Sequence, residues 1–180
     1  VTLGMDPTRS SVLYAGTSGG VYKSVDQAAH WVQVNHGLVP EGMVKTSRAL
    51  SVTSVQVDPF TTETVYAATL AGLYKTTDGA VSWVRIGESL QDQMIVSMVL
   101  DRARPGVMYV AARDGIHRSD DGGKSWVALN EGLATTNIRS LAQSALDPQL
   151  FYAGTNGSGL YRSTDGGAHW EALPSVFPKE

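Results

Sequence analysis

Short runs in which hydrophobic and polar positions alternate recur along the whole chain. Examples are VTSVQV (52–57), TVYAAT (64–69), GLYKT (72–76) and WVRIG (83–87). A period of two is typical of β-strands, and β-branched and aromatic residues dominate these runs. No stretch keeps a convincing helical period over three turns. The pattern therefore predicts an all-β protein made of short strands.

The strands belong to a unit that occurs four times. Aligned on their tyrosines, the matching segments are VLYAGTSGGVYKSVDQAAHW (12–31), TVYAATLAGLYKTTDGAVSW (64–83), VMYVAARDGIHRSDDGGKSW (107–126) and LFYAGTNGSGLYRSTDGGAHW (150–170). Their final tryptophans lie 52, 43 and 44 residues apart, and the longer first step contains an insertion, VPEGMVKTSRALS. Each unit reads as four strands, because turn residues such as Asp58-Pro59 separate the runs.

Four short antiparallel strands at this spacing are typical of the blades of a β-propeller. We therefore predict a β-propeller built of four-stranded antiparallel blades, with four blades in one unit, 1–180. The expected blades are approximately 1–39, 52–91, 94–134 and 137–175, with the insertion 39–51 between blades one and two.

Each unit contains an octapeptide of the form Ser/Thr-x-Asp-x-Gly-x-x-Trp, clearest in SDDGGKSW (119–126) and STDGGAHW (163–170). The aspartate can accept hydrogen bonds from N–H groups two or three residues on, the serine can add a hydroxyl bond, and the glycine permits a positive φ. The tryptophan can cover the turn while its indole N–H stays near the wet edge. The copies at 24–31 and 76–83 lack one or both glycines.

A catalytic aspartate repeated on four blades could not converge on one substrate, so we expect the octapeptide to be a folding device. The predicted structural residues are Ser24, Asp26, Trp31, Thr76, Asp78, Trp83, Ser119, Asp121, Gly123, Trp126, Ser163, Asp165, Gly167 and Trp170.

Composition excludes several classes of function. The 180 residues are 42% hydrophobic and 17% charged, with a formal net charge of −3, which lacks the basic excess of most nucleic-acid binders. There are no cysteines, so a disulfide, a thiolate metal site and a cysteine nucleophile are absent. No apolar run approaches the length of a membrane span, and no signal peptide is visible. We expect neither a nucleic-acid partner nor a membrane span.

The octapeptides resemble Asp-boxes, also called bacterial neuraminidase repeats. The wider unit runs Asp-Pro, then Tyr-Ala-Gly-Thr, then Gly-Leu-Tyr-Arg-Ser-x-Asp-Gly-Gly-x-x-Trp. It resembles blades of sortilin-type receptors, photosystem II stability/assembly factor-like proteins and two-propeller xyloglucan hydrolases. The resemblance covers essentially the whole chain, implies a propeller and favours an extracytoplasmic or secreted location. It does not select an activity, since receptors, assembly factors and enzymes share the scaffold.

The resemblance implies rings of six or more blades. Three arrangements follow for four blades: a fragment of a larger propeller, half of an eight-bladed ring completed by a second copy, or a closed four-bladed ring. An open half-ring would expose the apolar faces of its end blades. We therefore favour a fragment or a ring-completing dimer.

Ligands of propellers usually meet the face built by the loops between the second and third strands and between successive blades. The Asp-boxes lie on the opposite face. The candidate ligand-binding residues are Glu41, Lys45, Arg48, Asp92, Arg113, Asp114, Asn137, Arg139 and Asn156. A charged rim of loops suits a binding site, although scattered charge is also the default for surface loops.

No catalytic residue is predicted. A glycosidase needs two carboxyl groups about 5 to 10 Å apart, and nothing in the sequence pairs any two of the candidates. These candidates are Glu41, Asp92, Asp114 and Glu131. A sialidase usually has an Arg-Ile-Pro segment, whereas Arg85-Ile86 is followed by Gly87.

The histidines give no metal-ligand spacing, so no metal and no cofactor are expected. His30 and His169 precede the octapeptide tryptophans, His117 replaces a repeated tyrosine and reads as a packed strand residue, and His36 stands alone in a loop.

The sequence thus predicts a non-catalytic binding or scaffolding propeller that engages a protein, peptide or glycan through the loop face. The first alternative is part of a glycoside hydrolase that acts on a polysaccharide such as xyloglucan. The second is a repeat fragment or an engineered assembly without independent activity.

Overall fold

The computed structural model describes residues 1–38, 50–90 and 93–174. Within these ranges the chain forms four antiparallel sheets of four strands each, and one short 3-10 helix, η1 (Glu88–Leu90). The strands of the first two sheets are β1 (Thr2–Met5), β2 (Leu13–Thr17), β3 (Gly20–Ser24), β4 (Val32–Gln33), β5 (Val52–Val57), β6 (Val65–Thr69), β7 (Gly72–Thr76) and β8 (Val84–Ile86). Those of the last two are β9 (Ser97–Leu100), β10 (Met108–Ala112), β11 (Gly115–Ser119), β12 (Val127–Ala128), β13 (Ile138–Gln143), β14 (Phe151–Thr155), β15 (Leu160–Ser163) and β16 (Glu171–Ala172).

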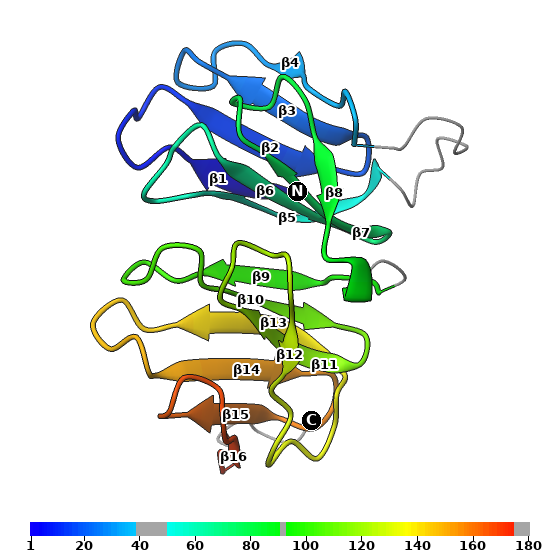
Figure 1. Cartoon of the computed structure of the whole chain (residues 1–180), viewed down its shortest axis with the longest axis vertical. Helices are drawn as coiled ribbons and strands as arrows, with labels where there is room; N and C mark the ends of the chain where they lie inside the picture. Colours follow the sequence, from blue (N-terminus) through cyan, green and yellow to red (C-terminus); the bar gives the residue numbers. More distant parts are fainter. Residues whose placement is uncertain (39–49, 91–92, 175–180) are drawn as a thin grey trace.

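Each sheet is a simple meander, with strands ordered as they occur in the chain. We call the sheets blade 1 (β1–β4), blade 2 (β5–β8), blade 3 (β9–β12) and blade 4 (β13–β16). The blades stack one on the next along the longest axis of the molecule, with blade 1 and blade 4 at opposite ends (Figure 1). Their first strands adjoin, with β1 against β5, β5 against β9 and β9 against β13. This arrangement confirms the prediction of an all-β fold of propeller blades.

Antiparallel order places the connections on two opposite faces. The turns between first and second strands and those between third and fourth strands lie at one end of the strands, which we call the box face. The turns between second and third strands and the connections between blades lie at the other end, the loop face. In Figure 1 the turns between first and second strands extend to the left of every blade.

The hydrophobic core lies between blades rather than inside any one of them. One cluster joins blades 1 and 2 and includes Tyr14, Val55 and Trp83. The second joins blades 2 and 3, and the third joins blades 3 and 4, where the rings of Tyr109 and Phe151 lie 4.4 Å apart. Each blade therefore needs a neighbour to bury its apolar face, as in other repeat proteins.

The octapeptides form the turns between third and fourth strands, which we call box turns (24–31, 76–83, 119–126 and 163–170). In blade 3 the Ser119 hydroxyl accepts hydrogen bonds from the N–H groups of Asp121 and Gly123, at 3.3 and 2.9 Å, and donates to Oδ1 of Asp121 at 2.8 Å. The Asp121 carboxylate accepts from the N–H groups of Lys124 and Ser125. The aspartate thus accepts from N–H groups three and four residues further along the chain, one residue further than predicted. The nearer N–H group of Gly123 donates to the serine hydroxyl instead.

The tryptophans depart from the prediction of a wet indole N–H. Trp83 and Trp170 are only 3% exposed, and each donates its Nε1–H to a carbonyl of the preceding blade. The acceptors are Val34 O at 2.7 Å and Leu129 O at 3.0 Å. The prediction was wrong here because the preceding blade covers the ring. Trp126 instead donates to Gly123 O at 3.1 Å in its own turn.

The box turns that lack one or both glycines keep the same backbone conformation. Gln27, Ala28 and Ala80 have φ angles of 59°, 71° and 73°, in the left-handed region that their glycine counterparts adopt in blades 3 and 4. A Cβ in that region crowds the following carbonyl and costs about 1–2 kcal/mol. The turn therefore persists under strain, because the serine or threonine and the aspartate still fix it.

Candidate functional site

A pocket of about 300 Å³ opens between blades 3 and 4 at the loop-face end of the strands. We call it the loop-face pocket. It is lined by Met94, Val96, Ala112, Arg113, Thr136, Asn137, Ile138 and Arg139. Three of these, Arg113, Asn137 and Arg139, were predicted as ligand-binding residues from the sequence, although Arg113 and Arg139 come from different blades. They meet because blade 4 stacks directly on blade 3.

Short hydrogen bonds fix the backbone around this pocket. The Thr135 hydroxyl accepts from the Asn137 N–H at 3.1 Å, and the Ile138 N–H donates to Thr136 O at 2.8 Å. The Asn137 carbonyl accepts the N–H of Asn156 at 3.0 Å and so ties the pocket to the turn between β14 and β15. Arg113 is held by the tight two-residue turn between β10 and β11. The pocket is therefore largely formed before a ligand arrives.

The electrostatic character of the pocket comes from its two arginines. Both are exposed, and neither forms an ion pair within the part of the chain that the structure describes. No carboxylate and no aromatic ring stands among the lining residues. Because a guanidinium stays protonated at every physiological pH, the pocket presents two permanent positive charges. It can hold an anionic group between them.

The other predicted ligand-binding residues lie elsewhere. The carboxylate of Asp114 accepts a bond from Nε2 of His117 at 2.8 Å, and Asp114 is not among the residues that line the pocket. His117 itself is 7% exposed, as expected for a packed strand residue. Asn156 is exposed in the turn before β15. The remaining candidates, Glu41, Lys45, Arg48 and Asp92, lie outside the described residues.

Two glycosidase candidates from the sequence, Asp114 and Glu131, lie within the described residues, and each contacts a histidine. Glu131 lies in the connection between blades 3 and 4 and contacts the box turn of blade 4. Its backbone carbonyl accepts the N–H of Trp170 at 2.8 Å, and its carboxylate lies 3.5 Å from Nε2 of His169. The hydrogen bond with Asp165 and the nearby negative charge of Glu131 raise the pKa of His169. Asp114 and Glu131 thus contact different histidines, His117 and His169.

Two further pockets lie along the first strands at the box-face end, and sequence reasoning missed them. The larger, of about 490 Å³, is bounded by Leu3, Met5 and Pro59, and the smaller, of about 280 Å³, by Met98 and Gln143. They share Gln56, Leu100 and Arg102. The exposure of Leu3 and Met5, apolar residues in a first strand, could have been anticipated only by knowing that β1 lies at one end of the stack.

In residues 1–38, 50–90 and 93–174, no three histidine or acidic side chains come together as a set of metal ligands. The same residues contain no helix with the length and hydrophobicity needed to cross a membrane.

Comparisons with known proteins give structures but no sequence family. No family model matches the chain, and no curated protein sequence matches it. Among solved structures, an ancestral GH74 enzyme matches with a TM-score of 0.79 and 23% identity over 97% of this chain. The GH74 xyloglucanase from Xanthomonas campestris matches with a TM-score of 0.74 and 18% identity over 99% of this chain.

A second kind of protein has the same blades. YCF48 bound to D1 peptide matches with a TM-score of 0.64 and 18% identity over 95% of this chain. The chain spans 24% and 30% of the two GH74 enzymes and 53% of YCF48. These identities establish the shared fold and nothing finer. The chain is therefore a stack of four β-propeller blades, similar in fold to GH74 propeller enzymes and to YCF48.

Proposed function

We propose that this protein is a peptide-binding propeller that takes a carboxylate of an acidic peptide into the loop-face pocket. The observation that carries the proposal is the pair Arg113 and Arg139, which flank one preformed pocket without an acidic partner among the described residues. An arginine fork matches a carboxylate in a bidentate geometry, and two forks from neighbouring blades define its position. The Asn137 side chain adds an amide that can bond the peptide backbone.

Size and lining favour a peptide over a polysaccharide. A pocket of about 300 Å³ lies at the low end for small-molecule sites, so it suits one side chain or one chain terminus rather than a row of sugars. The absence of an aromatic ring and of a carboxylate from its lining removes the stacking platform and the acid that a glycosidase site needs. The fold likeness to YCF48 bound to D1 peptide is in keeping with peptide binding on this scaffold.

The test is binding of fluorescein-labelled octapeptides that differ only in charge. We expect peptides with glutamate or aspartate to raise fluorescence anisotropy at micromolar protein, and matched neutral and basic peptides to leave it unchanged. Each acidic peptide is prepared with a free C-terminal carboxylate and as the amide. Loss of binding in the amides identifies the chain terminus as the bound group, whereas equal binding identifies a side chain.

Variants locate the site. Arg113→Ala and Arg139→Ala should each weaken binding about tenfold or more, since a charge-assisted hydrogen bond contributes about 1.5–3 kcal/mol. Arg102→Ala is the matched control, because Arg102 is an equally exposed arginine that lines the pockets at the box face. Binding that depends on Arg102 and ignores Arg113 and Arg139 would refute the proposal.

The hydrolase alternative predicts a different result. The likeness to GH74 enzymes concerns the fold, and the carboxylates that could serve such an enzyme include Glu41 and Asp92, outside the described residues. Release of reducing sugars from xyloglucan, abolished by Glu41→Gln or Asp92→Asn, would favour that alternative over peptide binding.

A further inference from the structure

Blades 1, 2 and 3 each present the same two side chains to the blade that follows. The pair is a tyrosine from the second strand and a cation from the third strand that lies over the tyrosine ring. The cation stands 5.5 Å from the ring centre for Lys23 over Tyr14, and 5.3 Å for Lys75 over Tyr66. In blade 3, the Arg118 guanidinium lies 5.8 Å from the ring centre of Tyr109.

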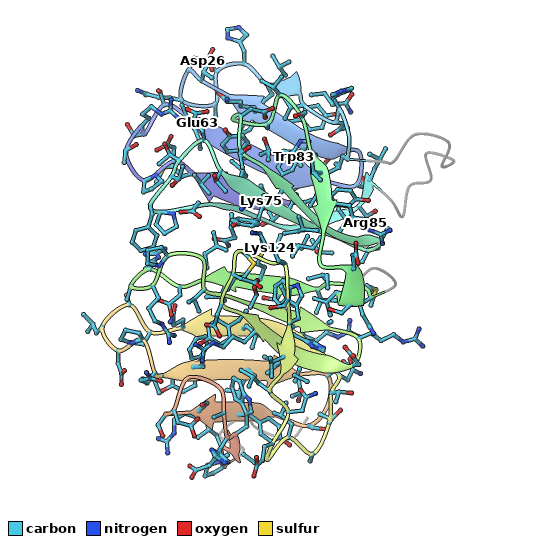
Figure 2. The ribbon with its side chains drawn as sticks, in the orientation of Figure 1. Asp26, Glu63, Lys75, Trp83, Arg85 and Lys124 are labelled. Atoms are coloured by element: carbon cyan, nitrogen blue, oxygen red, sulfur yellow. The ribbon has the colours of Figure 1, made fainter. Side chains whose placement is uncertain are left out.

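Each pair packs against the box turn of the next blade. Between blades 1 and 2, the Tyr14 hydroxyl and the Lys23 ammonium both donate to the carbonyl of Gly79, at 3.4 and 2.8 Å. Between blades 2 and 3, a Cβ added to Gly122 would lie 3.5 Å from Lys75 Nζ. Figure 2 places Lys75 beside the box turn that contains Lys124, at the boundary of these blades.

The same contact recurs between blades 3 and 4, where a Cβ added to Gly166 would lie 3.8 Å from the Tyr109 hydroxyl. The tyrosines of blades 1 to 3 are accordingly buried, with 0%, 1% and 0% of Tyr14, Tyr66 and Tyr109 exposed. Burial raises the pKa of Tyr14 and of Tyr66 to about 12.

Blade 4 carries the same pair, with no box turn among the described residues over it. Tyr152, the counterpart of Tyr109, is 40% exposed. Arg162 is the counterpart of Arg118, and its Nε is buried without a hydrogen-bond partner in the described part of the chain. Its Nη2 reaches only Glu171, at 3.3 Å. The blade-4 face, defined by Tyr152 and Arg162, therefore has both halves of the docking pair and no box turn to receive them.

Blade 1, at the other end of the stack, carries the box turn that this tyrosine–cation pair lacks. Its box turn places Gln27 where blade 2 has Gly79, and the Gln27 N–H donates to Ser11 O just as the Gly79 N–H donates to Glu63 O. No described group donates to the Gln27 carbonyl. Trp31 is 37% exposed, whereas the tryptophan of blade 2 is covered by the preceding blade. The box turn and Trp31 define the blade-1 face, at the end marked by Asp26 in Figure 2.

We propose that the blade-4 face of one copy docks on the blade-1 face of a second copy, with Tyr152 and Arg162 donating to the Gln27 carbonyl. The three internal interfaces specify this occupant, because each shows what covers a tyrosine–cation pair. Both halves occur in one chain but at opposite ends of the stack, so one copy does not satisfy itself (Figure 1). Two copies satisfy both ends through two equivalent contacts and form a head-to-tail dimer.

The test is the solution mass of the chain by light scattering and sedimentation. At about 100 µM we expect a mass near 38 kDa, that of two 19.2 kDa chains. Tyr152→Asp and Trp31→Asp should each give a 19.2 kDa monomer, because every contact needs both faces. Val127→Asp is the control, since Val127 is 65% exposed, more than Tyr152 or Trp31, but lies on the edge strand of blade 3, away from both end faces.

A mixing experiment separates docking from misfolding. A Tyr152→Asp chain retains its blade-1 face and a Trp31→Asp chain retains its blade-4 face, so an equimolar mixture should recover one contact and a heterodimer. Failure of folding would instead leave both variants as monomers in the mixture, with loss of their circular dichroism signal. A monomeric wild-type chain at every concentration would overturn the proposal, as would a dimer that survives both substitutions. A monomer would point to a further blade of the same polypeptide as the occupant.

Discussion

Replacing Ser119 by alanine should destabilise the protein by about 2–3 kcal/mol. The Ser119 hydroxyl is buried and makes three hydrogen bonds in the box turn of blade 3. Alanine leaves the Gly123 N–H buried without an acceptor, and a stranded buried donor costs about 1–3 kcal/mol. Loss of the bonds to Asp121 adds to that cost.

The measurement is urea unfolding, followed by tryptophan fluorescence and by circular dichroism. For a chain of this length, each kcal/mol corresponds to about 2–4 °C, so the midpoint of thermal unfolding should fall by about 4–12 °C. Because repeat proteins can unfold blade by blade, hydrogen exchange at the Gly123 amide gives a local readout, and its protection should be lost first.

Two further variants sharpen this test. Ser163→Ala removes the equivalent bond to the Gly167 N–H, 2.8 Å long, and should cost a similar amount. Ser125→Ala removes an exposed bond to Asp121 and should cost much less, because the groups left behind stay in water. Should Ser119→Ala prove no more harmful than Ser125→Ala, the box turn would not be held by its buried serine.

Three other predictions follow from the box turns. Ala28→Gly should stabilise blade 1 by about 1 kcal/mol, seen as a higher urea midpoint, because glycine relieves the φ of 71° at an exposed position. Trp83→Phe should lower the free energy of unfolding by about 1 kcal/mol, seen as a lower urea midpoint, since it keeps an aromatic ring but loses the bond to Val34 O. Hydrogen bonds from His30 and from His169 lower the pKa of Asp26 and of Asp165 to about 2. The two ionised carboxylates therefore stabilise the fold fully above about pH 4, and this stabilisation is lost as the pH falls towards 2. The urea midpoint should drop over that pH range, and it should drop less in Asp165→Asn.

The fold could be predicted from the sequence because its information is local and repeated. The tyrosine of each second strand, and the serine or threonine and the aspartate of each box turn, occupy fixed places in the unit, and four imperfect copies define the strand pattern. The strain at Gln27 and Ala28 could also be predicted, since a glycine position filled by another residue keeps the turn's φ.

What depends on neighbouring blades could not be predicted. Tyr109 and Tyr152 are the same position of the repeat, yet only Tyr109 is buried, because a box turn covers it. The indole of Trp83 bonds a carbonyl of the preceding blade for the same reason. Arg113 and Arg139 were each identified as loop residues, but their meeting in one pocket follows from stacking.

The most direct test of the account is a hydrogen-exchange map of the protein with a bound acidic peptide. The account predicts protection at 112–114 and 136–139, around Arg113 and Arg139, with exchange in the box turns unchanged. Protection confined to the box turns or to the first strands near Arg102 would contradict the claim that the box turns are a folding device and that function lies on the loop face.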